Sequence, residues 1–175
     1  MYKTVGVMGP SGKLTITQRR DAFGVGQMVA RRGFALITGG LGGVMEAASA
    51  SAKSEGGLVI GICPIGEKKL VNSFVDVAIM TDMGGGRNYM NILSSDAVIA
   101  IGCNRSAGTL SEIAFALQSA KPLMILRPPE KMQIFLESFA APGRAAFGSS
   151  LEDVDEFLGR VSAGFKAGEV KGYCQ

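Results

Sequence analysis

Short, continuously apolar segments that end in glycine-rich turns recur along the chain, and they constrain its fold more than any other feature. Residues 4–8 run into a turn at 9–12, and residues 34–38 run into a turn at 39–43. A stretch with apolar residues at helical spacing follows each turn. Glycine at the end of an apolar run is typical of tight turns, because it adopts backbone conformations that other residues avoid. The pattern therefore predicts strands that alternate with helices.

The same reasoning extends over the whole chain. We expect strands at residues 4–8, 34–38, 58–62, 75–80, 97–101, 122–126 and 145–147, and helices at 17–32, 44–54, 87–94, 107–120, 130–139 and 151–161. Because the predicted strands are apolar throughout, both of their faces should be covered. The sequence thus predicts an α/β fold, a single doubly wound Rossmann-like domain over residues 1–175. Its sheet should be mostly parallel, with about seven strands and helices on both faces, and ligands should bind beyond the carboxyl ends of the strands.

The composition excludes several classes of protein. The net charge of +3 is too small and too dispersed for a nucleic-acid surface, and no apolar run is long enough to span a membrane. The absence of histidine removes Ser-His-Asp and Cys-His catalysis. Cys63, Cys103 and Cys174 form no CxxC pair, so we expect no metal site and reduced thiols in a cytoplasmic protein.

The first glycine-rich turn, Gly9-Pro10-Ser11-Gly12-Lys13, fails the tests for two nucleotide-binding motifs. A Walker A loop would need glycine in place of Val7 and Ser or Thr in place of Leu14. A dinucleotide-binding fingerprint needs a different glycine spacing and an acidic residue at the end of the second strand. A P-loop NTPase and a dehydrogenase are therefore disfavoured. The backbone around Gly9 and Ser11 remains a candidate for contact with a phosphate.

The second turn carries a stronger signal. It contains Gly39, Gly40, Gly42 and Gly43, four glycines in five positions, whereas a simple turn needs one or two. The helix that follows directs its free N–H groups and the positive end of its dipole at the same place. We predict that this turn approaches a phosphorylated ligand closely.

Two later turns add polar groups. Gly84-Gly85-Gly86 precedes Arg87, whose guanidinium at a helix start opposes the helix dipole and is therefore a candidate fork for phosphate or carboxylate. Gly108 and Thr109 lie at the start of the helix after the fifth strand, where N–H and hydroxyl groups can bind a phosphate. Glu112 follows about one turn later among apolar neighbours, so we expect a partly buried carboxylate.

Taken together, these motifs resemble the Lonely Guy group, often labelled "lysine decarboxylase", and in particular its short branch, which includes the molybdenum cofactor carrier proteins. The resemblance extends from residue 5 to about residue 126. It rests on the order and spacing of VGVMGPSG, LITGGLGGVMEAASASAKSEGGLVIGICP, GGGRNYMNILSSDAVIAIG and AGTLSEIAFAL. No pyridoxal-phosphate motif is present, so the decarboxylase label has no support.

The resemblance implies two functions. In the hydrolytic members an Arg-Lys pair and a PGGxGTxxE motif bind and cleave a nucleoside monophosphate, without a cofactor. Arg87 matches that arginine, and Gly108, Thr109 and Glu112 match the GTxxE, so Arg87 and Glu112 would be catalytic. Asn88 replaces the lysine, however, and a longer loop at 102–106 replaces the PGG.

The alternative is a carrier or sensor that binds a phosphorylated pterin or a nucleotide without turnover, with the molybdenum cofactor as cargo. Cys103 and Arg105 motivate it, because they would place a soft sulfur atom and a cation beside the phosphate. In either case the partner is a phosphorylated small molecule. The helices at 87–94 and 107–120 carry more apolar residues than one sheet face needs, so we also expect a homodimer or homotetramer.

Overall fold

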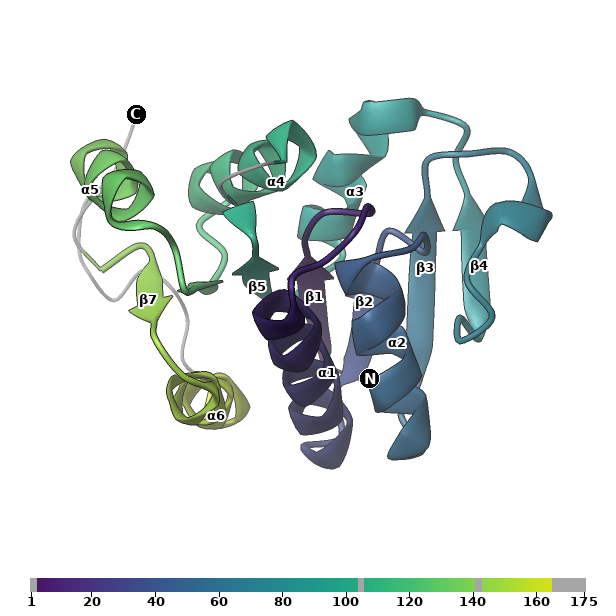
Figure 1. Cartoon of the computed structure of the whole chain (residues 1–175), viewed down its shortest axis with the longest axis horizontal. Helices are drawn as coiled ribbons and strands as arrows, with labels where there is room; N and C mark the ends of the chain where they lie inside the picture. Colours follow the sequence, from purple (N-terminus) through teal and green to yellow (C-terminus); the bar gives the residue numbers. More distant parts are fainter. Residues whose placement is uncertain (1–2, 104–105, 141–142, 165–175) are drawn as a thin grey trace.

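The chain forms one parallel sheet between two layers of helices (Figure 1). The computed structural model describes residues 3–103, 106–140 and 143–164. The strands are β1 (Thr4–Met8), β2 (Ala35–Thr38), β3 (Val59–Cys63), β4 (Val77–Met80), β5 (Ala97–Ile101), β6 (Leu123–Leu126) and β7 (Ala146–Gly148). The helices are α1 (Ile16–Arg31), α2 (Val44–Ser54), α3 (Arg87–Leu93), α4 (Ala107–Gln118), α5 (Glu130–Phe139) and α6 (Leu151–Ser162), with short 3-10 turns η1 (Lys68–Leu70) and η2 (Gly84–Gly86).

The strand order confirms the predicted doubly wound topology. It runs β4-β3-β2-β1-β5-β6-β7, and every neighbouring pair is parallel. The chain builds outward from β1 to β4 and then returns to the other side of β1 to place β5. After β1 the chain continues into a helix on one face of the sheet, and after β5 into a helix on the other face. A crevice therefore opens between the carboxyl ends of these two strands.

Two hydrophobic cores flank the sheet, because successive residues of a strand face opposite sides. One core packs β-strand residues such as Val7 and Ile99 against α1, α2 and α6. The other packs Val98 and Ile125 against α3, α4 and α5. The helix predicted at 151–161 is confirmed as α6, and Ser150 and Asp153 form a reciprocal capping box at its start.

One expectation about the strands is wrong. Coverage of both faces was expected throughout, but Val77 and Ile79 of the edge strand β4 are exposed. The connections from β1 to β2 and from β2 to β3 contain α1 and α2. The connection from β3 to β4 contains no α-helix that could cover β4. The loop at 65–74, which contains η1, joins β3 to β4 at this edge of the sheet. No helix among the described residues is long and apolar enough to cross a membrane.

Candidate functional site

A cavity of about 120 Å³ opens in the crevice between the carboxyl ends of β1 and β5. Its walls come from the turn after β1, the start of α2, and the facing ends of α3 and α4. Six of the predicted site residues line it: Gly9, Ser11, Arg87, Gly108, Thr109 and Glu112. Met8, Leu41, Met45, Asn88 and Ser106 complete the lining. The structure thus brings together groups that lie about a hundred residues apart in the sequence.

The four glycines of the second turn lie behind this wall instead of lining the cavity. A Cβ atom at Gly39 would overlap with the guanidinium of Arg87, so the glycine makes room for that side chain. Gly43 has a φ of 66°, and a Cβ there would collide with the backbone of Pro10 and Ser11. Gly40 packs against Cys63, and Gly42 against the carbonyl of Ser11. This turn therefore shapes the site from behind by holding Arg87 and the first turn in place.

Arg87 and Glu112 form a buried ion pair in the cavity wall. Arg87 Nη1 lies 3.2 Å from Glu112 Oε1, and the two residues are only 6% and 5% exposed. Such burial removes both charges from water, and only close contact and further hydrogen bonds offset the free-energy cost of this desolvation. Nε of Arg87 is buried and has no partner among the described residues. The guanidinium thus retains a donor that this part of the chain does not satisfy.

Burial also controls the protonation of the pair. It raises the pKa of Glu112 to about 7, although hydrogen bonds from Asn91 and the charge of Arg87 oppose the shift. Burial likewise lowers the pKa of Arg87, against the attraction of Glu112. Glu112 therefore exchanges its proton near neutral pH, where an exposed glutamate would be fully ionised.

Two asparagines of α3 hold this pair, and neither was predicted as a site residue. Asn91 Nδ2 donates to Glu112 Oε1 at 2.9 Å. Asn88 accepts from Arg87 Nη1 at 2.8 Å and donates to Ser111 Oγ at 2.9 Å, which ties α3 to α4. Asn91 lies four residues after Arg87 and three after Asn88, and this helical spacing is the sequence signal that could have identified Asn91.

Thr109 presents an unused donor at the start of α4. Its side chain is 1% exposed, and its hydroxyl has no hydrogen-bond partner in the described part of the chain. Ser106 caps the helix by accepting from the backbone N–H of Thr109 at 3.1 Å. The earlier N–H groups of α4 have no acceptor within the helix and point toward the cavity with the positive end of its dipole. This end of the cavity is therefore suited to an anion.

The comparisons with known proteins agree with the predicted relationship. The pattern of the SLOG cluster4 family matches residues 2–152. The chain belongs to the SLOG cluster4 family. An uncharacterised protein from Archaeoglobus fulgidus is 47% identical over 134 residues, which cover 75% of this chain and 86% of that protein.

Solved structures similar to this SLOG cluster4 chain include two proteins that handle the molybdenum cofactor. The molybdenum cofactor binding protein of Rippkaea orientalis is 40% identical, with a TM-score of 0.87 over 92% of this chain and 98% of that one. The molybdenum cofactor carrier protein of Chlamydomonas reinhardtii is 31% identical, with a TM-score of 0.85 over 93% and 99% of the two chains. The resemblance to the branch with these carriers is thus confirmed, and these findings favour the carrier alternative over hydrolysis.

One expectation about this SLOG cluster4 site is wrong. Cys103 was expected beside the phosphate, but it is 3% exposed and packs in the core formed with α4 and α5. Burial raises the pKa of its thiol, so it is a poor metal ligand there. Arg105, the other residue of that expectation, lies outside the described residues. Within the described ranges, no group of three or more His, Cys, Asp or Glu could hold a metal ion.

Proposed function

We propose that this chain binds a phosphorylated pterin of the molybdenum cofactor type and carries it without cleaving it. The observation that carries the proposal is the buried, unpartnered hydroxyl of Thr109 at the start of α4, in a cavity that also contains Arg87. An unpaired buried hydroxyl is costly, so its retention indicates a ligand that accepts its hydrogen bond. Similarity to two molybdenum cofactor proteins supports this class of cargo.

The size of the cavity fits an anchor for one end of the cargo. Whole small-molecule sites enclose roughly 300–1,000 Å³, whereas this cavity has about 120 Å³. It has room for a phosphate-sized group, while the remainder of the cargo would lie across the rim at Ser11, Leu41 and Met45. A carrier has to deliver its cargo intact, and a ligand held mainly by one end can be passed on.

Hydrolysis has weaker support. A hydrolase of this group would need Glu112 to stabilise a developing cation or orient water. Glu112 Oε1 already accepts from Arg87 and Asn91, so one carboxylate oxygen is already engaged within the protein. Asn88 stands where hydrolytic members have a lysine, and it is bound to Ser111. The pair is therefore better suited to positioning than to turnover.

A retention assay tests the proposal. The purified chain is mixed with molybdenum cofactor freshly released from a molybdoenzyme, and pterin fluorescence and molybdenum are measured after gel filtration. We expect both to elute with the wild type, and Thr109→Val to retain roughly fivefold less, as for the loss of one hydrogen bond of about 1 kcal/mol. Ser138→Ala, at an exposed hydroxyl on α5, is the matched control. Release of base from a nucleoside 5′-monophosphate that depends on Glu112 would instead establish the hydrolase.

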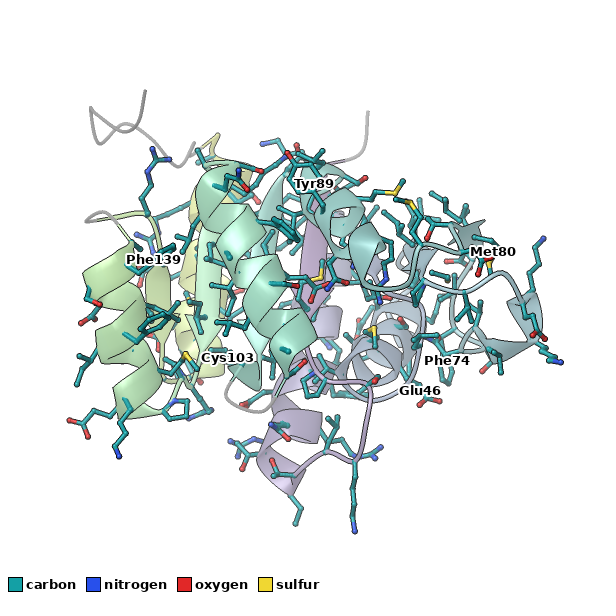
Figure 2. The ribbon with its side chains drawn as sticks, turned by 90° about the horizontal axis from the view of Figure 1, so that it is seen from above. Glu46, Phe74, Met80, Tyr89, Cys103 and Phe139 are labelled. Carbon is teal, nitrogen blue, oxygen red and sulfur yellow. The ribbon has the colours of Figure 1, made fainter. Side chains whose placement is uncertain are left out.

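Self-association belongs to the same proposal. Tyr89, Met90 and Leu93 of α3 are exposed apolar side chains, and Tyr89 packs edge-on against Phe115 of α4 with ring centroids 5.1 Å apart (Figure 2). We propose that this α3–α4 surface binds a second copy of the chain, because exposed apolar patches mark interaction sites. Light scattering should give an oligomer for the wild type and a monomer for Leu93→Glu. Phe139→Glu on α5 should remain oligomeric, and an oligomeric Leu93→Glu would refute this surface.

We also propose a cytoplasmic location. Cys63 and Cys103 are both free thiols in the structure, and burial raises the pKa of each, which fits a reducing compartment.

A further inference from the structure

A second cavity lies at the other end of the same sheet edge, where β6 and β7 finish. Its volume is about 320 Å³, and its lining consists of Arg127, Pro128, Gln133, Phe147, Gly148 and Ser149. It shares no lining residue with the cavity at α4. Figure 1 shows β7 between α5 and α6 here, at the end of the molecule away from β3 and β4. The volume reaches the lower end of the range typical of small-molecule sites.

Arg127 is fixed in this wall by its backbone and its side chain. Its φ of 50° is in the left-handed region, which is unusual for a residue other than glycine, and its N–H donates to the carbonyl of Gly148 at 2.7 Å. Its Nε donates at 3.0 Å to Oδ2 of Asp21, a residue of α1 that is only 2% exposed. The terminal nitrogens of the guanidinium donate to no other atom of the described part of the chain. Arg127 therefore offers an oriented pair of donors to the cavity.

The other walls indicate the shape of a ligand. Phe147 and Pro128 supply apolar surfaces suited to a flat ring. Gln133 donates one amide hydrogen to Glu137 at 2.8 Å, and its side-chain carbonyl oxygen accepts no hydrogen bond from the described residues. A small cavity with an aromatic wall, a guanidinium and an amide is typical of sites for flat, polar ring compounds.

The surrounding charges limit the anion that Arg127 can accept. Asp21 already compensates one side of the guanidinium, and Glu152 lies close enough for its charge to interact with Arg127. The start of α6 is not free for a phosphate, because Asp153 already accepts from the N–H groups of Ser149 and Ser150. A single negative charge is therefore favoured over a doubly charged phosphate.

We propose that this cavity is a second binding site, for a small aromatic or heteroaromatic monocarboxylate. Arg127 binds the carboxylate, and the ring lies along Phe147 and Pro128. The site is independent of the cargo cavity, so a regulator or a second metabolite of this class can bind while the first cavity is occupied.

Binding of anthranilate, a fluorescent ring monocarboxylate without phosphate, tests the proposal. We expect saturable binding to the wild type, and binding at least about tenfold weaker for aniline, which has the ring without the carboxylate. Inorganic phosphate should not displace anthranilate. No saturable binding, equal binding of aniline, or displacement by stoichiometric phosphate would overturn the proposed ligand class.

Variants locate the site. Arg127→Gln alone leaves the buried carboxylate of Asp21 with the weaker cation contact of Arg20, 3.9 Å away. The test variant is therefore Asp21→Asn/Arg127→Gln, which removes both charges of the pair. We expect this double variant, with a wild-type circular dichroism spectrum, to bind anthranilate at least about tenfold more weakly. Thr109→Val should bind it as the wild type does. Unchanged binding by the double variant, or loss of binding in Thr109→Val, would refute a site at Arg127, whatever the outcome of the cargo assay.

Discussion

Arg87 and Arg127 each pair with a buried carboxylate at the carboxyl edge of the sheet, yet the two pairs differ in their access to water. Arg87 and Glu112 are both buried, and their contact is 3.2 Å long. In the other pair Asp21 is buried, but the side chain of Arg127 is 36% exposed. An arginine that keeps contact with water has a much smaller desolvation cost.

Because they differ in exposure, the two arginine–carboxylate pairs have different roles. In the first pair burial raises the pKa of Glu112 to about 7, and α3, α4 and the turn at Gly39 enclose the guanidinium. Arg87 is therefore part of the wall, and its buried Nε has no hydrogen-bond partner in the described part of the chain. In the second pair Asp21 anchors Nε, and the outer nitrogens of Arg127 remain available. The first arrangement defines the shape of a cavity, and the second presents a cation to one.

The largest expected effect is that of breaking the fully buried pair. Arg87→Met keeps most of the side-chain volume but leaves Glu112 without a cation, so we expect the free energy of unfolding at pH 8 to fall by roughly 3 kcal/mol or more. Urea unfolding measures it. Arg31→Met is the matched control, because Arg31 forms an exposed ion pair with Glu55 and should leave stability unchanged. Equal, small effects of the two substitutions would contradict the contrast between buried and exposed pairs.

The next effect concerns pH. Between pH 4.5 and about 7 the folded chain keeps a proton on Glu112 that the unfolded chain releases, because the folded pKa is the higher one. This contribution to stability is complete below pH 4.5 and is lost as the pH rises through 7, a change on the order of 3 kcal/mol. Glu112→Gln should flatten this dependence in unfolding curves at pH 5 and pH 8. The exposed Glu156→Gln should follow the wild type, and a Glu112→Gln variant that also follows it would refute the shift.

Much of the fold could be predicted because its signals are local. The short apolar runs located all seven strands, and apolar residues at helical spacing located the six helices between and after them. The exception was β4, which has the composition of a covered strand although Val77 and Ile79 are exposed. A helix covers a strand only where a neighbouring connection of the chain is helical, and the composition of the strand itself does not show this.

The site was predictable only where a motif carried it. Gly108, Thr109 and Glu112 follow one another in a recognisable order, and they lie together in the cavity. The direction of the Cys103 side chain depends on the path of a loop, and its position in the sequence did not show that the sulfur packs in the core. The cavity at Arg127 joins segments about twenty residues apart with no glycine-rich turn between them. Such a site arises where α5, β7 and the segment after β6 pack together, so no sequence motif marks it.

A smaller effect is expected at the half-exposed pair. Arg127→Gln leaves Asp21 buried with a weaker partner, and we expect stability to fall by about 1–3 kcal/mol, less than for Arg87→Met. Adding Asp21→Asn should restore most of the loss, because neither charge then remains. Thermal and urea unfolding of the two single variants and the double variant measure this coupling. A double variant as unstable as the sum of the two single variants would show that the pair is not coupled, and Arg127 would then lack its anchor.

The smallest effect on stability is expected at Thr109, where stability and binding should change in opposite directions. Valine has nearly the shape of threonine, and the hydroxyl that it removes is buried without a partner, so Thr109→Val should leave the free energy of unfolding unchanged or raise it by up to about 1 kcal/mol. Ser106→Ala is the informative contrast, because it removes the N-cap of α4 and should cost about 1 kcal/mol. A stabilised variant that binds its cargo less well would mean that the chain keeps this hydroxyl for a ligand. A clear loss of stability in Thr109→Val would instead show that the hydroxyl has a structural partner, and the strongest argument for an anion in this cavity would fail.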